Sequence, residues 1–148
     1  MGEKVTRAAI GLVKRRDRYL ICQRHPGGFF GGCWEFPGGK REVGESWEMC
    51  LRRELREELG IAIKAIRPFG RMRYRYAGGC IIFQVFRCAI AKGEPRPLDA
   101  AALHWVKPHQ LPRYRFPPAN RRLITQLARE GEAKRGSDPS GASVGVML

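Results

Sequence analysis

One short acidic segment restricts what this chain can fold into more than any other feature. Residues 52–60 read RRELREELG, and an apolar side chain recurs at every fourth position around it. These apolar residues are Leu51, Leu55 and Leu59. The spacing predicts an α-helix whose apolar stripe must be covered by a hydrophobic core. Ser46 is suited to cap the start of this helix and Gly60 to end it.

The same helix would place three carboxylates side by side. Glu54, Glu57 and Glu58 fall within an arc of roughly 100° when the chain advances about 100° per residue. Carboxylates this close repel one another unless a cation lies near them, and oxygen-rich clusters suit Mg²⁺ or Mn²⁺. The alternative is a solvated helix face with ion pairs such as Arg53 with Glu57. The helix alone does not decide between these two interpretations.

The longer stretch from residue 39 to residue 61, GKREVGESWEMCLRRELREELGI, resembles the signature of the Nudix hydrolases. Every fixed place of that signature is filled, by Gly39, Glu45, Arg53, Glu54, Leu55, Glu57, Glu58, Gly60 and Ile61. The resemblance implies that the three helix glutamates bind Mg²⁺, or Mn²⁺ as a substitute, together with a backbone carbonyl of Gly38 or Gly39. It also implies that Glu45 and Arg53 hold those carboxylates in place. The implied reaction is cleavage of a nucleoside diphosphate linked to a further group.

Outside the signature, the chain resembles the MutT-type 8-oxo-dGTP diphosphatases. WEFPGGK (34–40) leads into the signature as in that family, and FPPAN (116–120) precedes the last expected helix. The resemblance implies that Asn120 hydrogen-bonds the oxidised guanine. It assigns further substrate contacts, to base or phosphate, to Arg24, Glu35, Phe36, Pro37, Gly38 and Lys40.

Some of these residues also have purely structural interpretations. Asn120 would serve equally as a helix cap, Phe36 as a core residue and Arg24 as a surface charge at the end of a strand. The aromatic residues Trp34, Tyr74 and Tyr76 are interpreted as packing residues.

The general base is left open by the sequence. MutT-type enzymes often carry an acidic residue just before the tryptophan that corresponds to Trp105, and this chain has His104 there. Histidine is able to act as a base near neutral pH, but His104 is interpreted first as a bystander or as a residue whose role has shifted. Asp99 is an acidic alternative nearby, and the three helix glutamates also remain candidates.

The remaining sequence predicts a mixture of strands and helices. Apolar runs at 8–13 and 19–22 predict a β-hairpin, residues 61–91 predict two strands around Gly78, and 102–106 predict a short strand. The last helix should begin near the prolines of 116–118. Its apolar stripe would be Leu123, Ile124 and Leu127. We therefore expect an α/β (α+β) fold, a Nudix-type α/β/α sandwich with a central mixed sheet and two main helices.

Length and composition limit the number of domains and the compartment. The chain has 148 residues, so we expect one domain over 1–130 and a disordered tail over 131–148. Five cysteines without a C-x-x-C pair, and no signal-peptide pattern, predict reduced thiols and a cytoplasmic location. A net charge of +14 suits an anionic partner but is equally compatible with simple solubility.

The sequence predicts a Mg²⁺-dependent MutT-type enzyme that hydrolyses 8-oxo-dGTP to 8-oxo-dGMP and pyrophosphate, which cleans the nucleotide pool and prevents mutation. One alternative is the same chemistry on another nucleotide, such as dCTP, methylated dCTP or another nucleoside triphosphate. A second is a non-catalytic MutT-like module that binds 8-oxoguanine in DNA. For the enzyme, we expect a nucleoside triphosphate as partner, no stable nucleic-acid complex, no membrane association and a monomer.

Overall fold

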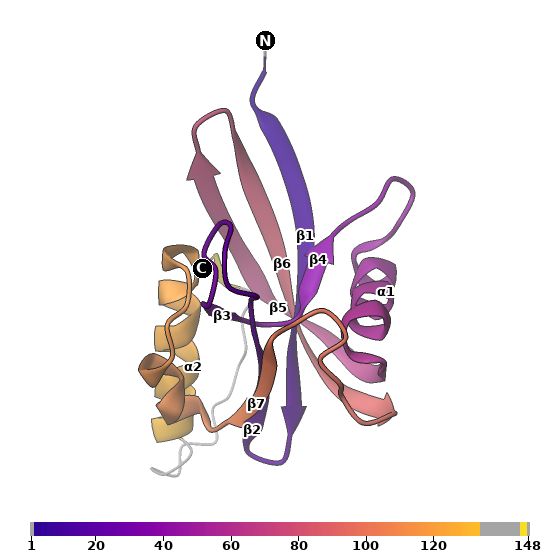
Figure 1. Ribbon diagram of the computed structural model, residues 1–148, viewed down its shortest axis with the longest axis vertical. Coiled ribbons are helices and arrows are strands. Elements are labelled where there is room, and N and C mark those ends of the chain that lie inside the picture. The colour runs from indigo at the N-terminus through magenta and orange to yellow at the C-terminus, as the bar shows by residue number, and fades with distance from the viewer. Residues whose placement is uncertain (1, 134–145, 148) are drawn as a thin grey trace.

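Two helices lie on opposite faces of one mixed β-sheet in the computed structural model, which describes residues 2–133 and 146–147. Helix α1 (Trp47–Leu59) covers one face and helix α2 (Arg121–Ala133) covers the other (Figure 1). This arrangement confirms the expected α/β/α sandwich with two main helices. No helix in the described residues is long and apolar enough to cross a membrane.

The sheet is organised around the long first strand. Strand order is β3-β2-β1-β6-β5-β8, with β4 added to β1 and β7 added to β2. The strands are β1 (Lys4–Arg15), β2 (Arg18–Gln23), β3 (Trp34–Glu35), β4 (Gly38–Lys40), β5 (Ala62–Tyr76), β6 (Gly79–Lys92), β7 (Ala102–Val106) and β8 (Val146–Met147). β1 pairs in parallel with β6 and antiparallel with β2 and β4, which makes the sheet mixed. Two 3-10 helices, η1 (Pro108–Arg113) and η2 (Pro118–Asn120), connect β7 to α2.

Most of the expected strands are confirmed. The β1–β2 hairpin turns at residues 16–17, the β5–β6 hairpin turns at 77–78, and β7 occupies the short strand expected at 102–106. β4 lies in a segment for which the sequence predicted no strand, and it pairs with Ala8, Ala9 and Ile10 of β1. A glycine-rich segment carries no alternating apolar pattern, so this pairing left no signal in the sequence.

Helix α1 begins and ends where the sequence predicts. The Ser46 hydroxyl accepts a hydrogen bond from the Met49 amide at 3.1 Å, which caps the first turn. Gly60 ends the helix in the left-handed conformation, with a φ of 71°. The expected leucine stripe, Leu51, Leu55 and Leu59, is fully buried.

Gly11 of β1 allows α1 to approach the sheet closely. A Cβ at this position would lie 3.2 Å from Leu51 Cδ1 and 3.3 Å from Leu55 Cδ2, tighter than most real contacts. The helix therefore packs directly on the backbone of β1. This close packing fixes the distance between the sheet and the helix glutamates beside the leucine stripe.

Helix α2 closes the opposite face. Its stripe of Leu123, Ile124 and Leu127 packs in a core with residues of β1 and β2, as expected. Arg87 of β6 forms an ion pair with Glu130 of α2, which ties the helix to the sheet. The helix continues to Ala133, past the expected domain boundary, and β8 pairs in parallel with β5. Residues 134–145 and 148 of the expected tail lie outside the described residues.

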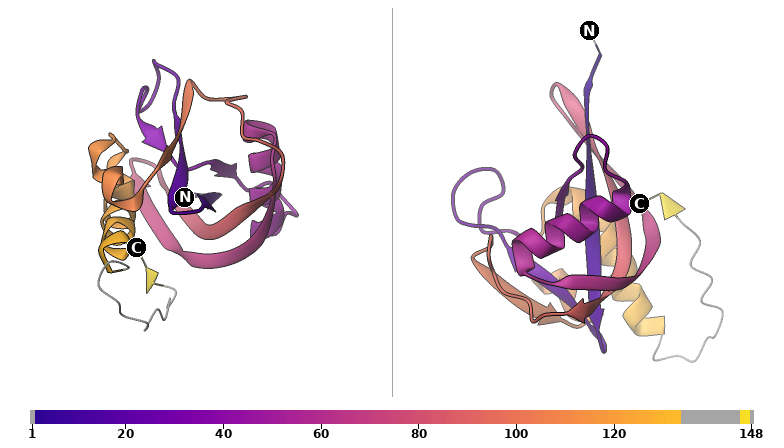
Figure 2. Two further views of the ribbon diagram at one scale, coloured as in Figure 1. Left: turned by 90° about the horizontal axis from the view of Figure 1, so that it is seen from below. Right: turned by 90° about the vertical axis from the view of Figure 1, so that its right-hand side faces the viewer.

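The sheet extends well beyond α1 at one end. The start of β1 and the β5–β6 hairpin form a projecting part of the sheet that neither helix covers (Figures 1 and 2). We call this part the arm and define it as residues 4–8, 71–76 and 79–83. In the arm, β1 and β6 run in parallel with a continuous register from Lys4 opposite Gly79 to Ala8 opposite Phe83.

Candidate active site

Arg53 is hydrogen-bonded to three glutamates on and around α1. Its Nε and Nη2 atoms donate to the two carboxylate oxygens of Glu45 at 2.7 and 2.9 Å. Its Nη1 atom donates to Glu54 at 2.9 Å and to Glu57 at 3.2 Å. The Arg53 side chain is only 17% exposed, so these charge-assisted contacts lie in a partly dry environment. The guanidinium supplies the positive charge that clustered carboxylates require.

The contact with Glu45 also fixes the loop before α1. Hydrogen bonds from Arg53 lower the pKa of the Glu45 carboxyl to about 2, so this group stays ionised. Arg53 Nη2 also donates to the backbone carbonyl of Lys40 at 3.0 Å, at the end of β4. One side chain therefore links the helix, the loop and the edge of the sheet.

The Gly38–Gly39 turn lies directly against the helix carboxylates. A Cβ at Gly39 would lie 2.3 Å from Glu54 Cδ, and a Cβ at Gly38 would lie 2.0 Å from the Ala9 carbonyl oxygen. A side chain at Gly38 would collide with the backbone of β1, and one at Gly39 would displace the Glu54 carboxylate. The Gly38 amide donates to the Glu58 carboxylate at 3.3 Å. The two glycines thus bring backbone atoms of the turn next to Glu54 and Glu58.

Glu58 is the most perturbed acid of this cluster. Burial, together with the smaller effect of the neighbouring charges of Glu54, Glu35 and Asp99, raises the pKa of its carboxyl to about 8. The hydrogen bond from the Gly38 amide opposes this shift without overcoming it. A carboxyl in this position binds a proton near neutral pH unless a cation replaces that proton.

The carboxylates do not form a closed metal site on their own. Among the described residues, no three acidic, histidine or cysteine side chains converge as metal ligands. Glu57 is 58% exposed and is held by Arg53 instead. The donor set nevertheless suits a hard divalent cation, because the carboxylates of Glu54 and Glu58 lie against Gly39 and Gly38 and such cations prefer oxygen ligands.

Asp99 is brought to the cluster by the segment that follows β6. The Arg96 amide donates to the Leu59 carbonyl at 3.0 Å, and the Leu98 amide donates to the Glu58 carbonyl at 3.1 Å. These bonds attach the segment to the end of α1. Asp99 then lies close enough to raise the pKa of Glu58.

His104 lies elsewhere. Its ring packs on Trp34 with ring centroids 4.6 Å apart, and its Nδ1 atom lies 3.2 Å from the Tyr114 hydroxyl. It faces the α2 side of β7 and is not among the residues that line the cavity described next. The place of His104 in the sequence, just before Trp105, left a role as general base open. In the structure, its side chain points away from the helix glutamates.

A cavity of about 710 Å³ begins at the acidic cluster and extends under the arm. Its lining includes Glu58, Asp99, Gly38, Gly39 and Lys40. Asn120 and Phe36 also line it, in a second part of the wall that we call the far wall. Arg24 and Glu35 line it as well, so the structure brings together most of the substrate residues expected from the sequence. Pro37 is the exception, because it does not line the cavity; its carbonyl accepts a hydrogen bond from the Gly11 amide at 2.8 Å.

The far wall of the cavity combines aromatic and polar groups. Phe36 is buried and stacks near Phe116, with ring centroids 5.3 Å apart. Arg24 and Glu35 form an ion pair at 3.0 Å, with both side chains about 40% exposed. Glu35 is also close enough to Glu58 to raise the pKa of that carboxyl, so this pair lies near the acidic cluster as well. This wall offers a flat apolar surface with hydrogen-bonding groups at its edge.

Asn120 is buried at this wall, with 9% of its surface exposed. Within the described part of the chain, its one side-chain hydrogen bond is a donation to the Pro117 carbonyl at 3.4 Å. A helix cap would instead accept a hydrogen bond from the first turn of α2. The geometry therefore favours a role in the cavity over the capping role.

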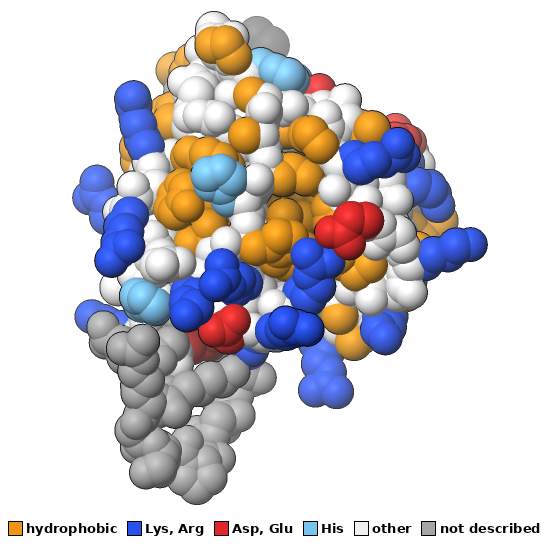
Figure 3. All heavy atoms as spheres, turned by 60° about the horizontal axis from the view of Figure 1, so that its bottom comes forward, with side chains coloured by type: hydrophobic (Ala, Val, Ile, Leu, Met, Phe, Trp, Pro, Cys, Tyr) orange, Lys and Arg blue, Asp and Glu red, His pale blue; other side chains and the backbone are white. Residues whose placement is uncertain are grey.

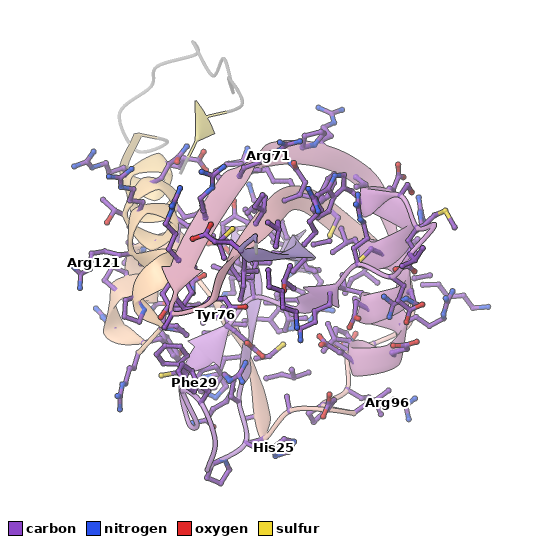
Figure 4. All side chains as sticks on the ribbon, turned by 90° about the horizontal axis from the view of Figure 1, so that it is seen from above. His25, Phe29, Arg71, Tyr76, Arg96 and Arg121 are labelled. Carbon is purple, nitrogen blue, oxygen red and sulfur yellow. The ribbon has the colours of Figure 1, made fainter. Side chains whose placement is uncertain are left out.

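Several cavity residues were missed by the sequence reading. Tyr74 and Tyr76, interpreted as packing residues, line the cavity together with Phe29 and Phe30 of the 24–33 loop. Figure 4 shows Tyr76 and Phe29 on neighbouring sides of the cavity when the molecule is seen from above. The available signal was the alternation of arginine with Tyr74 and Tyr76, since side chains alternate between the faces of a strand.

Comparisons with known proteins identify relatives of this chain. A family model described as a NUDIX domain matches residues 8–126. An 8-oxo-dGTP diphosphatase of Haemophilus influenzae is 34% identical over 131 residues, which cover 88% of this chain and 96% of that protein. A CTP pyrophosphohydrolase of Escherichia coli is 30% identical over 82% of this chain and 90% of its own length. The solved structure of a MutT NUDIX hydrolase from Burkholderia pseudomallei matches with a TM-score of 0.75 and 29% identity, covering 84% of this chain and 98% of that one.

The raised pKa of Glu58 predicts how Glu58→Gln changes the stability of the metal-free protein. The folded pKa of about 8 lies above the ordinary value of 4.5. The protonated carboxyl therefore adds stability that is fully present below about pH 4.5 and is lost as the pH rises through 8. Glutamine stays neutral, so the variant should match the wild type near pH 4.5 and be more stable by on the order of 3 kcal/mol at pH 8.5.

Urea unfolding in the presence of EDTA at the two pH values measures this difference. Glu57→Gln is the matched control, because its side chain lies in solvent on the same helix. An effect of Glu58→Gln that is the same at both pH values would contradict the assignment of a buried, destabilised carboxylate.

Proposed function

We propose that this chain, which belongs to the Nudix family, is a Mg²⁺-dependent MutT-type enzyme that hydrolyses 8-oxo-dGTP to 8-oxo-dGMP and pyrophosphate. The observation that carries the proposal is the continuity of one cavity. Its acidic end, at Glu58 and Gly39, and its base-binding end, at Asn120 and Phe36, belong to the same space. A nucleotide placed there would have its phosphates at the carboxylates and its base against the aromatic wall.

The divalent cation would be held by oxygens of α1 and of the glycine turn. Glu54, Glu57 and Glu58 supply the carboxylates, and Gly38 or Gly39 supplies a backbone carbonyl. Bound Mg²⁺ would neutralise charge on the phosphates and lower the pKa of a water molecule; Mn²⁺ has the same ligand preference. The hydrogen bond from Arg53 keeps the Glu54 carboxylate oriented toward the glycine turn, and the hydrogen bond to Glu45 holds the Arg53 guanidinium in place.

The chain's own groups position the phosphates and accept the proton. Lys40 lines the acidic end of the cavity, where its ammonium would bind a phosphate oxygen. In the proposed reaction, the water oxygen bonds to the β-phosphorus and the bond to the oxygen of the departing nucleoside monophosphate breaks. The water proton passes to a carboxylate of this end, Glu58 or Asp99, because both line the cavity and His104 does not.

The far wall would read the oxidised base. 8-Oxoguanine carries an N7–H donor beside its O6 acceptor, whereas guanine has two acceptors on this edge. The amide of Asn120 offers one acceptor and two donors and is able to match the donor–acceptor pair. Phe36 provides an apolar face for the purine, and the Arg24–Glu35 pair supplies polar contacts at its rim.

One alternative substrate class has specific support. The relative from Escherichia coli at 30% identity is named as a CTP pyrophosphohydrolase, so the same chemistry on a cytidine nucleotide is the second candidate. A non-catalytic module that binds oxidised DNA is disfavoured, because every carboxylate of the signature is retained and Arg53 holds Glu54 in place at 2.9 Å.

The proposed enzyme would act as a monomer in the cytoplasm. The one chain supplies both the helix carboxylate of Glu58 and the expected base-binding residue Asn120 to the cavity, so the proposed reaction requires no residue from a second subunit. The five cysteines are free and buried, which suits a reducing compartment. There the enzyme would remove the oxidised nucleotide before it is incorporated into DNA.

A panel of nucleotides tests the proposal. We expect kcat/KM for 8-oxo-dGTP to exceed that for dGTP, dCTP, 5-methyl-dCTP and CTP by at least about 100-fold, because a polar site rejects a base that leaves its buried groups unpaired. Released monophosphate and pyrophosphate are quantified with and without Mg²⁺. A higher value for a cytidine nucleotide would favour the second candidate, and no turnover of any nucleotide would refute the enzyme assignment.

Glu57→Gln should reduce Mg²⁺-dependent hydrolysis by at least about 100-fold, because the charge that would stabilise the bound cation is lost. Stability should change little, because the Glu57 side chain is 58% exposed and its contact with Arg53 is an exposed ion pair. Initial rates over a Mg²⁺ titration measure the loss, and thermal unfolding verifies the fold. Glu48→Gln, an exposed residue in the first turn of the same helix, is the matched control and should retain wild-type rates. Near-normal activity of Glu57→Gln would remove Glu57 from the metal site.

Asn120→Ala should lower the preference for 8-oxo-dGTP over dGTP by at least about tenfold, because the lost amide contacts distinguish the two purine edges. The ratio of the two kcat/KM values measures this preference. Thr125→Ala, which removes an exposed hydrogen bond to the Arg121 carbonyl in α2, is the control for general effects on the helix. Equal losses for both nucleotides would indicate that Asn120 acts only structurally.

A further inference from the structure

We propose that the arm carries a binding surface for single-stranded nucleic acid on the face opposite the cavity. Three consecutive outward positions of β5 and one position of β1 form this surface, which we call the arginine face. It consists of Arg7, Arg71, Arg73 and Arg75, with Val5 and Ile82 between them.

Strand alternation separates the arginine face from the cavity. Tyr74 and Tyr76 line the cavity, so the arginines at the intervening positions of β5 point to the other side of the sheet. Register brings Arg7 to the same side, because Arg7 of β1 and Arg73 of β5 both lie opposite Ile82 of β6. Figure 4 shows Arg71 on the far side of the ribbon from Tyr76.

The arginines of this face are available to an external anion. Arg7, Arg73 and Arg75 are exposed, and among residues 2–130 no acidic side chain lies within ion-pair distance of any of them. Arg71 donates through Nε to Gln84 at 2.9 Å, which orients its guanidinium group at the edge of the face. Helix α1 does not cover this part of the sheet (Figure 2).

An aromatic residue borders the arginine face. The Arg41 amide donates to the Arg7 carbonyl at 2.8 Å, so Arg41 lies beside Arg7 at the edge of the arm. Its guanidinium stacks over the Trp47 ring, 4.6 Å from the ring centroid. Unpaired bases bind to aromatic side chains and arginine planes of this kind, next to basic residues that contact the phosphates.

The spacing favours a linear polyanion over a single small anion. Alternate residues of a strand lie about 7 Å apart, so the guanidinium groups of β5 form a row and do not converge on one point. Arg7 and Arg73 lie two strands apart, roughly 10 Å, which widens the row into a strip. A strip on a narrow, twisted arm suits the repeated phosphates of one strand better than the flat surface of a membrane. Arginine binds such phosphates through paired hydrogen bonds.

Net charge by itself does not single out this face. Lys and Arg side chains are also spread around a hydrophobic area at the opposite end of the molecule (Figure 3). Elsewhere in the described chain, basic residues such as Arg15 and Arg24 are paired with carboxylates. The arginine face differs from these pairs because four arginines lie on one strip of the sheet without an acidic partner among the described residues. The proposal departs from our expectation that no stable nucleic-acid complex forms.

Binding of a fluorescent single-stranded oligonucleotide of about 20 thymidines tests the proposal. Anisotropy is measured in EDTA and without nucleotide substrate, so the result does not depend on the proposed hydrolysis. Arg73→Glu/Arg75→Glu should raise Kd at least about tenfold in 50 mM salt and reduce the slope of log K against log salt by roughly 1.4, as expected for two lost phosphate contacts. Hydrolysis by this variant should stay unchanged, because neither side chain lines the cavity.

Arg16→Glu/Arg18→Glu is the matched control. It makes the same change in net charge in the β1–β2 turn, at the opposite end of the molecule from the arm, and should change Kd less than about threefold (Figure 1). Equal weakening by both double variants would overturn the proposal, since net charge would then explain binding. It would also be overturned if the protein bound phosphatidylserine vesicles but not the oligonucleotide.

Discussion

The paired hydrogen bonds between Arg53 and Glu45 are the interaction on which the site depends. They anchor a guanidinium beside Glu54 and Glu57, without which two adjacent carboxylates would repel each other. The same guanidinium holds the Lys40 carbonyl, so the loop before α1 and the end of β4 are fixed together. The glycine turn is placed against the helix as a result. A basic residue within the acidic segment is therefore a structural requirement of that segment.

Local patterns in the sequence predicted the parts of the fold that rest on local chemistry. The leucine stripe, the Ser46 cap and the Gly60 end defined α1, because helix periodicity and capping depend only on neighbouring residues. The glutamates could be assigned to one face for the same reason. The apolar runs at 8–13 and 19–22 predicted the first hairpin, and the two strands expected around Gly78 predicted the second. Strand β4 was missed, since Gly38 and Gly39 are chosen for the space that they leave empty and not for any propensity.

The positions of residues that only tertiary contacts bring together could not be predicted from the sequence. His104 stood in the expected place of an acid, but the pairing of β7 with β2 turns it toward Trp34. Asp99 reaches Glu58 through two backbone hydrogen bonds to the end of α1, which no sequence pattern encodes. Tyr74 and Tyr76 alternate with arginines in the sequence, which predicts that the tyrosines and the arginines lie on opposite faces of the strand. The sequence does not indicate which of these two faces lines a cavity.

Strand β1 contributes to both faces of the sheet at once. Thr6, Ala8 and Ile10 line the cavity, while Arg7, Ala9 and Gly11 belong to the α1 side. Because the side-chain period of a strand is two, a one-residue insertion would exchange these two sets. Alternate residues of β1 therefore form the cavity lining and the surface under α1. A substitution in β1 is able to alter one of these surfaces alone, whereas an insertion or deletion in the strand must alter both.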